Sequence, residues 1–74
     1  MQLSTKKLAH EINKSLDEIG VPENSKERLV IFSRMLDIPR QQAWSLLEGQ
    51  SIPDEKTLEK ITSELEIDTD DVIN

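Results

Sequence analysis

Apolar residues recur along this chain with the three- and four-residue spacing of helices that bury one face. The first stripe comprises Leu8, Ile12, Leu16 and Ile19. It predicts a helix over residues 5–19. Gly20 ends this helix because glycine readily takes the left-handed conformation, and Pro22 cannot continue it.

The next helix is predicted over residues 25–36. Asn24 and Glu27 have the spacing of a capping box, in which each side chain bonds a free backbone N–H at the start of a helix. Ser33 lies on the same face as the apolar residues of this segment. A small side chain there permits the close approach of another helix, although a solvent-exposed serine is the alternative interpretation.

Asp37 occupies a turn before a third helix, which is predicted over residues 39–48 and ends at Gly49. Pro39 is acceptable in the first turn because its missing N–H would have no partner there. The inner face comprises Ala43, Leu46 and Leu47, which leaves outside or at the flank Arg40, Gln41, Gln42, Trp44 and Ser45. The exposed side of this helix is therefore a short row of hydrogen-bonding groups with one indole.

Asp54 is placed to cap a fourth helix over residues 55–65, whose apolar residues again recur at helical spacing. Asp68 is placed to cap a short fifth helix that carries Val72 and Ile73. No strand signal, internal repeat or linker interrupts this series.

The length of 74 residues allows one domain at most, and its core must be mainly aliphatic because Phe32 and Trp44 are the only aromatic residues. We therefore expect residues 1–74 to form a single compact all-α domain, a five-helix bundle. Two helices joined by a short turn, over about residues 25–48, predict a helix-turn-helix.

The net charge of −6 comes entirely from the last third of the chain. Residues 1–50 hold seven basic and seven acidic residues, whereas residues 51–74 hold two basic and eight acidic ones. The acidity therefore does not by itself exclude a nucleic-acid-binding face on the first two thirds of the chain.

Several classes of protein are disfavoured by what the sequence lacks. There is no cysteine for a disulfide or thiolate metal site, His10 has no second ligand in view, and no nucleophile–base pair or glycine-rich phosphate loop occurs. We therefore expect no enzyme, no metal and no cofactor. Residues 1–7 lack the apolar stretch of a signal peptide, and no apolar run could span a bilayer, which predicts a cytoplasmic protein without membrane contact.

From residue 12 to residue 73 the chain reads INKSLDEIGVPENSKERLVIFSRMLDIPRQQAWSLLEGQSIPDEKTLEKITSELEIDTDDVI. This stretch resembles the phage-repressor-like helix-turn-helix family of the Cro and lambda-repressor type, the XRE family, and is most similar to its small phage-type regulators. The positions that carry the resemblance are the small Ser33, the aliphatic positions Leu36, Ile38, Ala43 and Leu46, and the ending Leu47-Glu48-Gly49.

The resemblance implies a lambda-repressor-like fold and a sequence-specific transcriptional regulator of phage or mobile-element type. It also implies double-stranded DNA and a second copy of the chain as partners. Three positions depart from the family pattern. Asp37 replaces the turn glycine, Pro39 replaces the usual Ser or Thr cap, and Trp44-Ser45 replaces a basic pair.

In this interpretation the third helix enters the major groove and reads bases. The candidate base-reading residues are Arg40, Gln41, Gln42, Trp44 and Ser45, and the candidate phosphate contacts are Lys26, Arg28, Gln50 and Ser51. The plainer alternative is that all of these are ordinary residues on a solvated surface.

Trp44 has three open interpretations: a contact with DNA, a peripheral part of the core, or the anchor of a protein partner. The last would make the domain an antirepressor or adaptor that acts through Trp44 and the acidic C-terminal helices. The candidate residues of a homodimer interface are Leu65, Ile67, Val72 and Ile73. Their alternative role is to close the core of the monomer.

Overall fold

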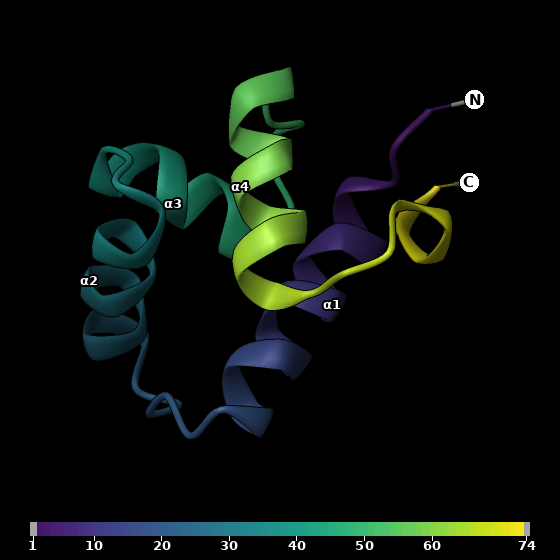
Figure 1. Ribbon diagram of the computed structural model, residues 1–74. Coiled ribbons are helices and arrows are strands. Elements are labelled where there is room, and N and C mark those ends of the chain that lie inside the picture. The colour runs from purple at the N-terminus through teal and green to yellow at the C-terminus, as the bar shows by residue number, and fades with distance from the viewer. Residues whose placement is uncertain (1, 74) are drawn as a thin grey trace.

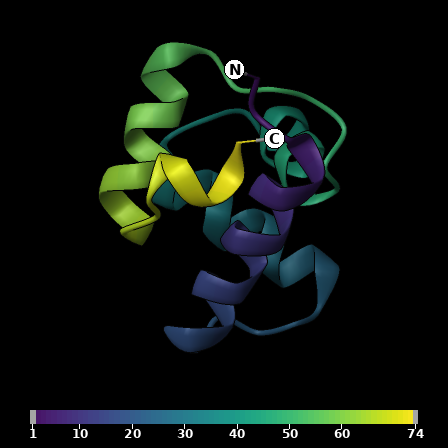
Figure 2. The ribbon, with the colours of Figure 1, turned by 90° about the vertical axis from the view of Figure 1, so that its right-hand side faces the viewer.

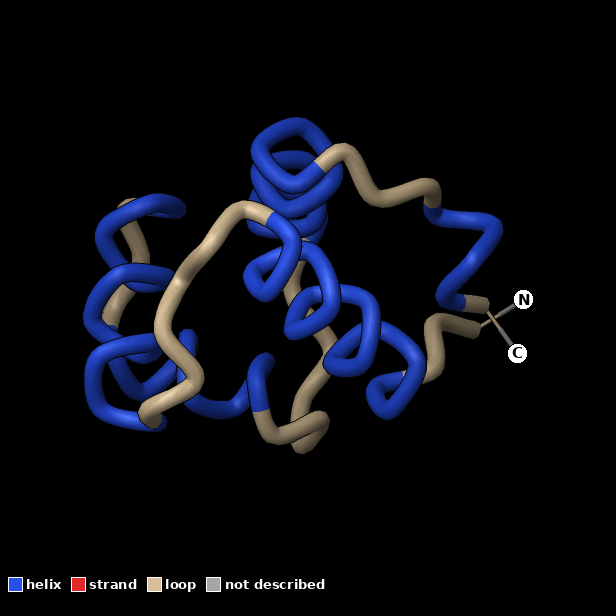
Figure 3. Tube along the Cα trace, turned by 90° about the horizontal axis from the view of Figure 1, so that it is seen from below, coloured by secondary structure: helices blue, strands red, loops and turns tan. Residues whose placement is uncertain are grey.

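The structure, a computed structural model, describes residues 2–73. The helical elements are α1 (Thr5–Glu18), α2 (Ser25–Leu36), α3 (Arg40–Leu47), α4 (Glu55–Leu65) and the 3-10 turn η1 (Thr69–Val72). Figure 1 shows α2 and α3 on one side of the domain and α1 crossing beneath α4. In Figure 3 the described chain consists of helices joined by loops, with no strand. The protein is thus a small all-helical domain of four helices.

The predicted fifth helix is wrong, because the segment after α4 forms only the single 3-10 turn η1. Asp68 does cap this turn, since its side chain accepts a hydrogen bond from the Asp70 N–H at 3.0 Å. After this turn the chain is extended and pairs with the segment before α1. The Ser4 N–H donates to the Val72 carbonyl at 2.7 Å, and Leu3 and Ile73 form an antiparallel bridge. Figure 2 shows η1 lying against α1.

Local sequence signals set the helix starts. The Asn24 side chain accepts hydrogen bonds from the backbone N–H groups of Lys26 and Glu27, so the predicted cap of α2 is present. Pro39 is the N-cap residue of α3 and makes no side-chain capping hydrogen bond. This is expected because proline lacks the hydroxyl of the Ser or Thr that it replaces in the family pattern. The third helix begins at Arg40 and spans eight residues.

Asp54 caps α4 and accepts a hydrogen bond from the Thr57 N–H at 2.9 Å. Hydrogen bonding from the Thr57 side chain and backbone lowers the pKa of Asp54 below its ordinary value of 3.8. The same threonine also receives a hydrogen bond from α3, since Gln42 Nε2 donates to Thr57 Oγ1 at 3.1 Å. One side chain thus links the start of α4 to α3.

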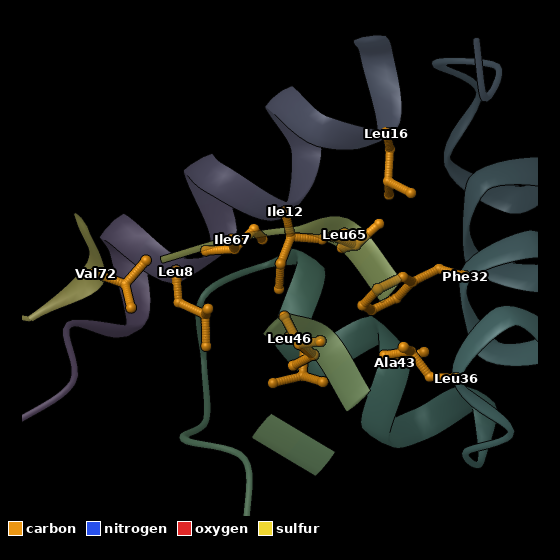
Figure 4. Packing of buried hydrophobic residues seen from close by; sticks show 11 residues of the cluster. Leu8, Ile12, Leu16, Phe32, Leu36, Ala43, Leu46, Leu65, Ile67 and Val72 are labelled. Carbon is orange, nitrogen blue, oxygen red and sulfur yellow. The ribbon is translucent and has the colours of Figure 1, made fainter. Parts of the chain in front are cut away.

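The hydrophobic core joins all four helices and the C-terminal segment (Figure 4). Its buried residues are Leu8, Ile12, Leu16, Phe32, Leu36, Ala43, Leu46, Ile61, Leu65, Ile67 and Val72. Ser33 is also buried, and its Oγ donates to the Val30 carbonyl at 2.9 Å. Ser33 therefore lies on the buried face of α2, as expected, and not on the solvent-exposed surface.

Left-handed backbone conformations occur at both the turn before α3 and the turn after it. Asp37, which ends α2, has φ of 53°, and Gly49, which follows α3, has φ of 70°. A Cβ atom at Gly49 would lie 3.2 Å from the backbone oxygen of Thr5 and 3.4 Å from the Ala9 Cβ. The loop after α3 therefore depends on a glycine both for its conformation and for its close approach to α1.

The four candidate interface residues lie largely inside the monomer. Leu65, Ile67 and Val72 belong to the buried core, and Ile73 is half-buried and bridged to Leu3. This placement corresponds to a role in the core of the monomer and not to a homodimer interface. They close the core where the C-terminal segment folds back on α1, so they offer little apolar surface to a second copy.

Candidate nucleic-acid interface

Helices α2 and α3 form the pair that the sequence predicts, joined by residues 37–39. The turn is held by backbone hydrogen bonds: Asp37 N–H donates to the Arg34 carbonyl at 3.2 Å, and Ile38 N–H donates to the Ser33 carbonyl at 3.0 Å. Leu36 of α2 and Ala43 of α3 lie beside each other in the core (Figure 4). The packing of these buried residues turns the remaining side of α3 outward.

Arg40 and Gln41 are exposed in the first turn of α3. Within residues 2–73 no hydrogen bond or ion pair engages either side chain. Gln42 is half-buried and directed to α4, where it donates to Thr57. Of the three polar residues that begin α3, the structure thus leaves two free to contact a ligand and uses the third in packing.

Trp44 and Ser45 occupy the next turn of α3. Trp44 is 45% exposed, which places its indole on the outer flank of the helix rather than in the core. Ser45 is half-buried. The peripheral-core interpretation of Trp44 is therefore disfavoured, whereas contact with DNA and contact with a protein both remain compatible with its position.

The candidate phosphate contacts differ in accessibility. Lys26, in the first turn of α2, and Gln50, after α3, are exposed, and Ser51 is half-buried. Asn24 already accepts hydrogen bonds from two N–H groups at the start of α2, so the ammonium of Lys26 carries most of the attraction that this end offers to an anion.

Arg28 is buried and engaged within the protein, which disfavours its assignment as a phosphate contact. The residue is buried, with 6% of its surface exposed, and its guanidinium points into the junction between α1 and α2. Nε donates to the Pro22 carbonyl at 3.0 Å, and Nη2 donates to the Val21 carbonyl at 2.9 Å and to Asp17 Oδ1. Nη1 donates to the Asn13 carbonyl and to Asn13 Oδ1, so all five N–H groups are engaged.

A signal for this placement is present in the sequence. Arg28, Phe32 and Leu36 follow one another at four-residue intervals, which puts the arginine on the buried stripe of α2. Asp17 on the preceding helix supplies a countercharge. The positive charge near a helix start suggests a phosphate contact, whereas this periodicity indicates burial.

Asn13 extends the same cluster to the end of α3, a role that the sequence did not suggest. Its Nδ2 donates to the Ala9 carbonyl at 2.9 Å and to the Leu47 carbonyl at 3.2 Å, while its Oδ1 accepts from Arg28. Asn13 therefore ties the C-terminal end of α3 to α1 and, through Arg28, to α2. We call Asn13, Asp17 and Arg28 the arginine cluster.

The exposed charges near α3 do not form a basic patch. Lys26 and Arg40 are accompanied by the exposed acids Glu23, Glu27 and Glu48. Because the exposed acids on and beside these two helices offset their exposed cations, phosphate attraction must come from individual contacts rather than from a field of positive charge.

Residues 2–73 contain no group of three or more potential metal-ligating side chains, and His10 is exposed. No helix within the same residues is long and apolar enough to cross a membrane. Comparisons with protein-family models, with curated proteins and with solved structures find no match to this chain. Its classification therefore rests on its own structure, which is that of a small compact all-helical domain of four helices.

Proposed function

We propose that this protein is a transcriptional regulator that binds double-stranded DNA and reads base pairs in the major groove with α3. The observation that carries the proposal is the exposure of Arg40 and Gln41, both free of intramolecular partners, in the first turn of the second helix of a helix-turn-helix pair. The N-terminal residues of such a helix are the ones that reach base edges in the groove.

The chemistry of these two residues suits base reading. The guanidinium fork of Arg40 matches the O6 and N7 acceptors of guanine, and the amide of Gln41 matches the donor and acceptor of adenine. Gln42 keeps a supporting role, because its amide holds α3 to Thr57. Trp44 lies one turn further on, where its indole suits the apolar methyl of thymine.

The surrounding residues supply contacts that position the domain without reading sequence. Lys26 at the start of α2 and the polar pair Gln50 and Ser51 after α3 flank the reading helix along the chain. Two bidentate base contacts contribute about 1–3 kcal/mol of discrimination each, which is modest for one domain. A two-fold symmetric dimer on half-sites about one helical turn apart doubles the number of such base contacts.

The proposal is tested by selecting bound duplexes from a random DNA pool at moderate salt and sequencing the retained fraction. Enrichment of a two-fold symmetric motif supports a dimeric reader. Arg40→Ala should then reduce preference at one base pair of each half-site, whereas Lys26→Ala should weaken binding to all sequences about equally and lower the salt dependence. A folded protein that enriches no sequence would refute the proposed function.

Protein binding is a second candidate function. It is favoured by one observation, the 45% exposure of Trp44, because tryptophan is prominent among the residues that dominate binding energy at protein interfaces. In this alternative the domain acts as an antirepressor or adaptor. Loss of a partner complex on Trp44→Ala, together with absent DNA affinity, distinguishes it from the first.

A further inference from the structure

A hollow opens on the surface where the end of α3 approaches the start of α2 and the middle of α1. Its lining residues are Asn13, Glu23, Ser25, Arg28, Trp44, Leu47 and Glu48. DNA binding does not account for it, because the carboxylates of Glu23 and Glu48 repel phosphate.

The electrostatic character of this hollow is set by its two exposed carboxylates. Arg28 is the only cation among the lining residues, and its charge is paired with Asp17. Its five N–H groups are all committed to acceptors of Asn13, Asp17, Val21 and Pro22. The hollow therefore presents uncompensated negative charge and no guanidinium donor for an incoming anion.

The lining of the hollow combines this charge with an aromatic side chain. Trp44 is 45% exposed, and Leu47, which also lines the hollow, is half-buried. An indole attracts a lysine or arginine cation through its ring face, while the aliphatic stem of such a side chain packs on apolar surface. Glu48 is the C-cap residue of α3, and the negative end of the helix dipole there adds to the attraction for a cation.

We propose that this hollow binds a lysine or arginine side chain presented by a protein partner, with the cation against the indole of Trp44 and between the carboxylates of Glu23 and Glu48. The proposal rests on the second candidate function and specifies the chemistry of the partner. Arg40 and Trp44 lie four residues apart on α3 and thus on one face. A partner seated in the hollow therefore covers the face assigned to base reading and competes with DNA.

The test begins with a displayed library of random peptides selected on the whole protein. Trp44 is the only tryptophan in the chain, so its fluorescence reports directly on binding of each synthesised peptide. Selected peptides should share one Lys or Arg. Replacing that residue by the neutral analogues norleucine or citrulline should weaken binding about fivefold to tenfold, as expected for loss of a cation–π contact and two exposed ion pairs.

Variants of the protein assign the effect to the hollow. The double change Glu23→Gln and Glu48→Gln should weaken binding by a similar factor, and added salt should weaken only the wild-type complex strongly. Glu27→Gln is the matched control, since Glu27 is an exposed acid that does not line the hollow. All three side chains are exposed, so these changes leave the core intact.

Three outcomes count against the proposal. Peptides that require Trp44 but neither carboxylate retain protein binding as a function and overturn the cation site. Equal effects of Glu27→Gln and of the double change indicate attraction by overall charge alone, which also overturns it. Absence of any enriched peptide overturns both the cation site and the second candidate function.

Discussion

Replacement of Arg28 by methionine is expected to destabilise the domain strongly, although the residue lies outside the apolar core cluster. Methionine keeps much of the unbranched stem but removes every hydrogen-bond donor. The carbonyls of Val21, Pro22 and Asn13 and the Asn13 amide oxygen then lose their partner. The link from α2 through Asn13 to the end of α3 is broken at the same time.

The size of this effect follows from the burial of the groups involved. Hydrogen bonds to a charged group contribute about 1.5–3 kcal/mol each, and an acceptor left unsatisfied in the interior costs about 1–3 kcal/mol. Pro22 is exposed and Val21 is half-buried, so water replaces part of what is lost. We therefore expect a loss of about 2–4 kcal/mol, which lowers the Tm of a domain of this size by roughly 10–25 °C.

Two comparisons separate the backbone hydrogen bonds from charge. Arg34→Met removes the same charge from an exposed position of the same helix and should change the free energy of unfolding by less than about 0.5 kcal/mol. Asp17→Asn removes only the ion pair. Because the Asp17 side chain is 51% exposed, that change should cost less than about 1 kcal/mol.

Urea denaturation of the four proteins, followed by circular dichroism at neutral pH, measures these differences. Equal stability of the Arg28→Met and Arg34→Met variants would refute the claim that the arginine cluster supports the fold. An Asp17→Asn loss as large as that of Arg28→Met would instead show that the ion pair, and not the carbonyl contacts, supplies the stabilisation.

Three further predictions concern the ends of the helices and are checked by the same denaturation assay. Gly49→Ala should lower the free energy of unfolding by more than Gly20→Ala, because both sites have positive φ but only Gly49 lacks room for a methyl group; equal losses would contradict this. Glu66→Gly should stabilise by about 0.5–1 kcal/mol because Glu66 has φ of 54°, whereas Glu59→Gly inside α4 should destabilise by about 1 kcal/mol, and a shared sign would contradict the assignment of the helix end. The capping hydrogen bonds lower the pKa of Asp54 in the folded protein, so its ionised form contributes stability above its ordinary pKa of 3.8, and this contribution is lost as the pH falls through the lowered value. The stability advantage of the wild type over Asp54→Asn should therefore shrink between pH 6 and pH 2, and a difference independent of pH would count against this linkage.

Most of the fold could be predicted from the sequence because its signals are local. The bounds of α2 and α4 match the predicted residues, and those of α1 and α3 differ by one residue at one or both ends. Asp37 takes the left-handed conformation that its place in the turn requires. Caps, turn residues and apolar spacing act over a few positions, so they can be recognised without knowledge of the tertiary structure.

The C-terminal segment could not be predicted in the same way because its conformation depends on residues far away in the sequence. Asp68 and the acids after it are compatible with a helix start, and the sequence offers no sign that the chain will pair with the segment before α1. The hydrogen bond from Ser4 to Val72 joins residues at opposite ends of the chain. A short helix with little propensity of its own yields to such a contact.

The exposure of the candidate site residues could be predicted only in part, and the departures share one cause. Arg40 and Gln41 are exposed as expected, but Gln42 is drawn to Thr57 and Arg28 to the arginine cluster. Polar side chains at a helix start suit both a ligand and a neighbouring helix. Only the tertiary arrangement decides between the two, because the competing partners come from α1, from the loop that follows it and from α4.

The two ends of α3 favour ligands of opposite charge. At the N-terminal end, the exposed Arg40 adds to the positive end of the helix dipole, and this combination favours an anion such as the phosphate of the proposed DNA ligand. At the C-terminal end, Glu48 and the exposed face of Trp44 add to the negative end and attract a cation. Because α3 has only eight residues, a macromolecule bound at one end overlaps the other. Under the two proposals made above, a basic partner in the hollow and DNA at the first turn of α3 would exclude each other, and occupancy of the hollow would release the domain from DNA.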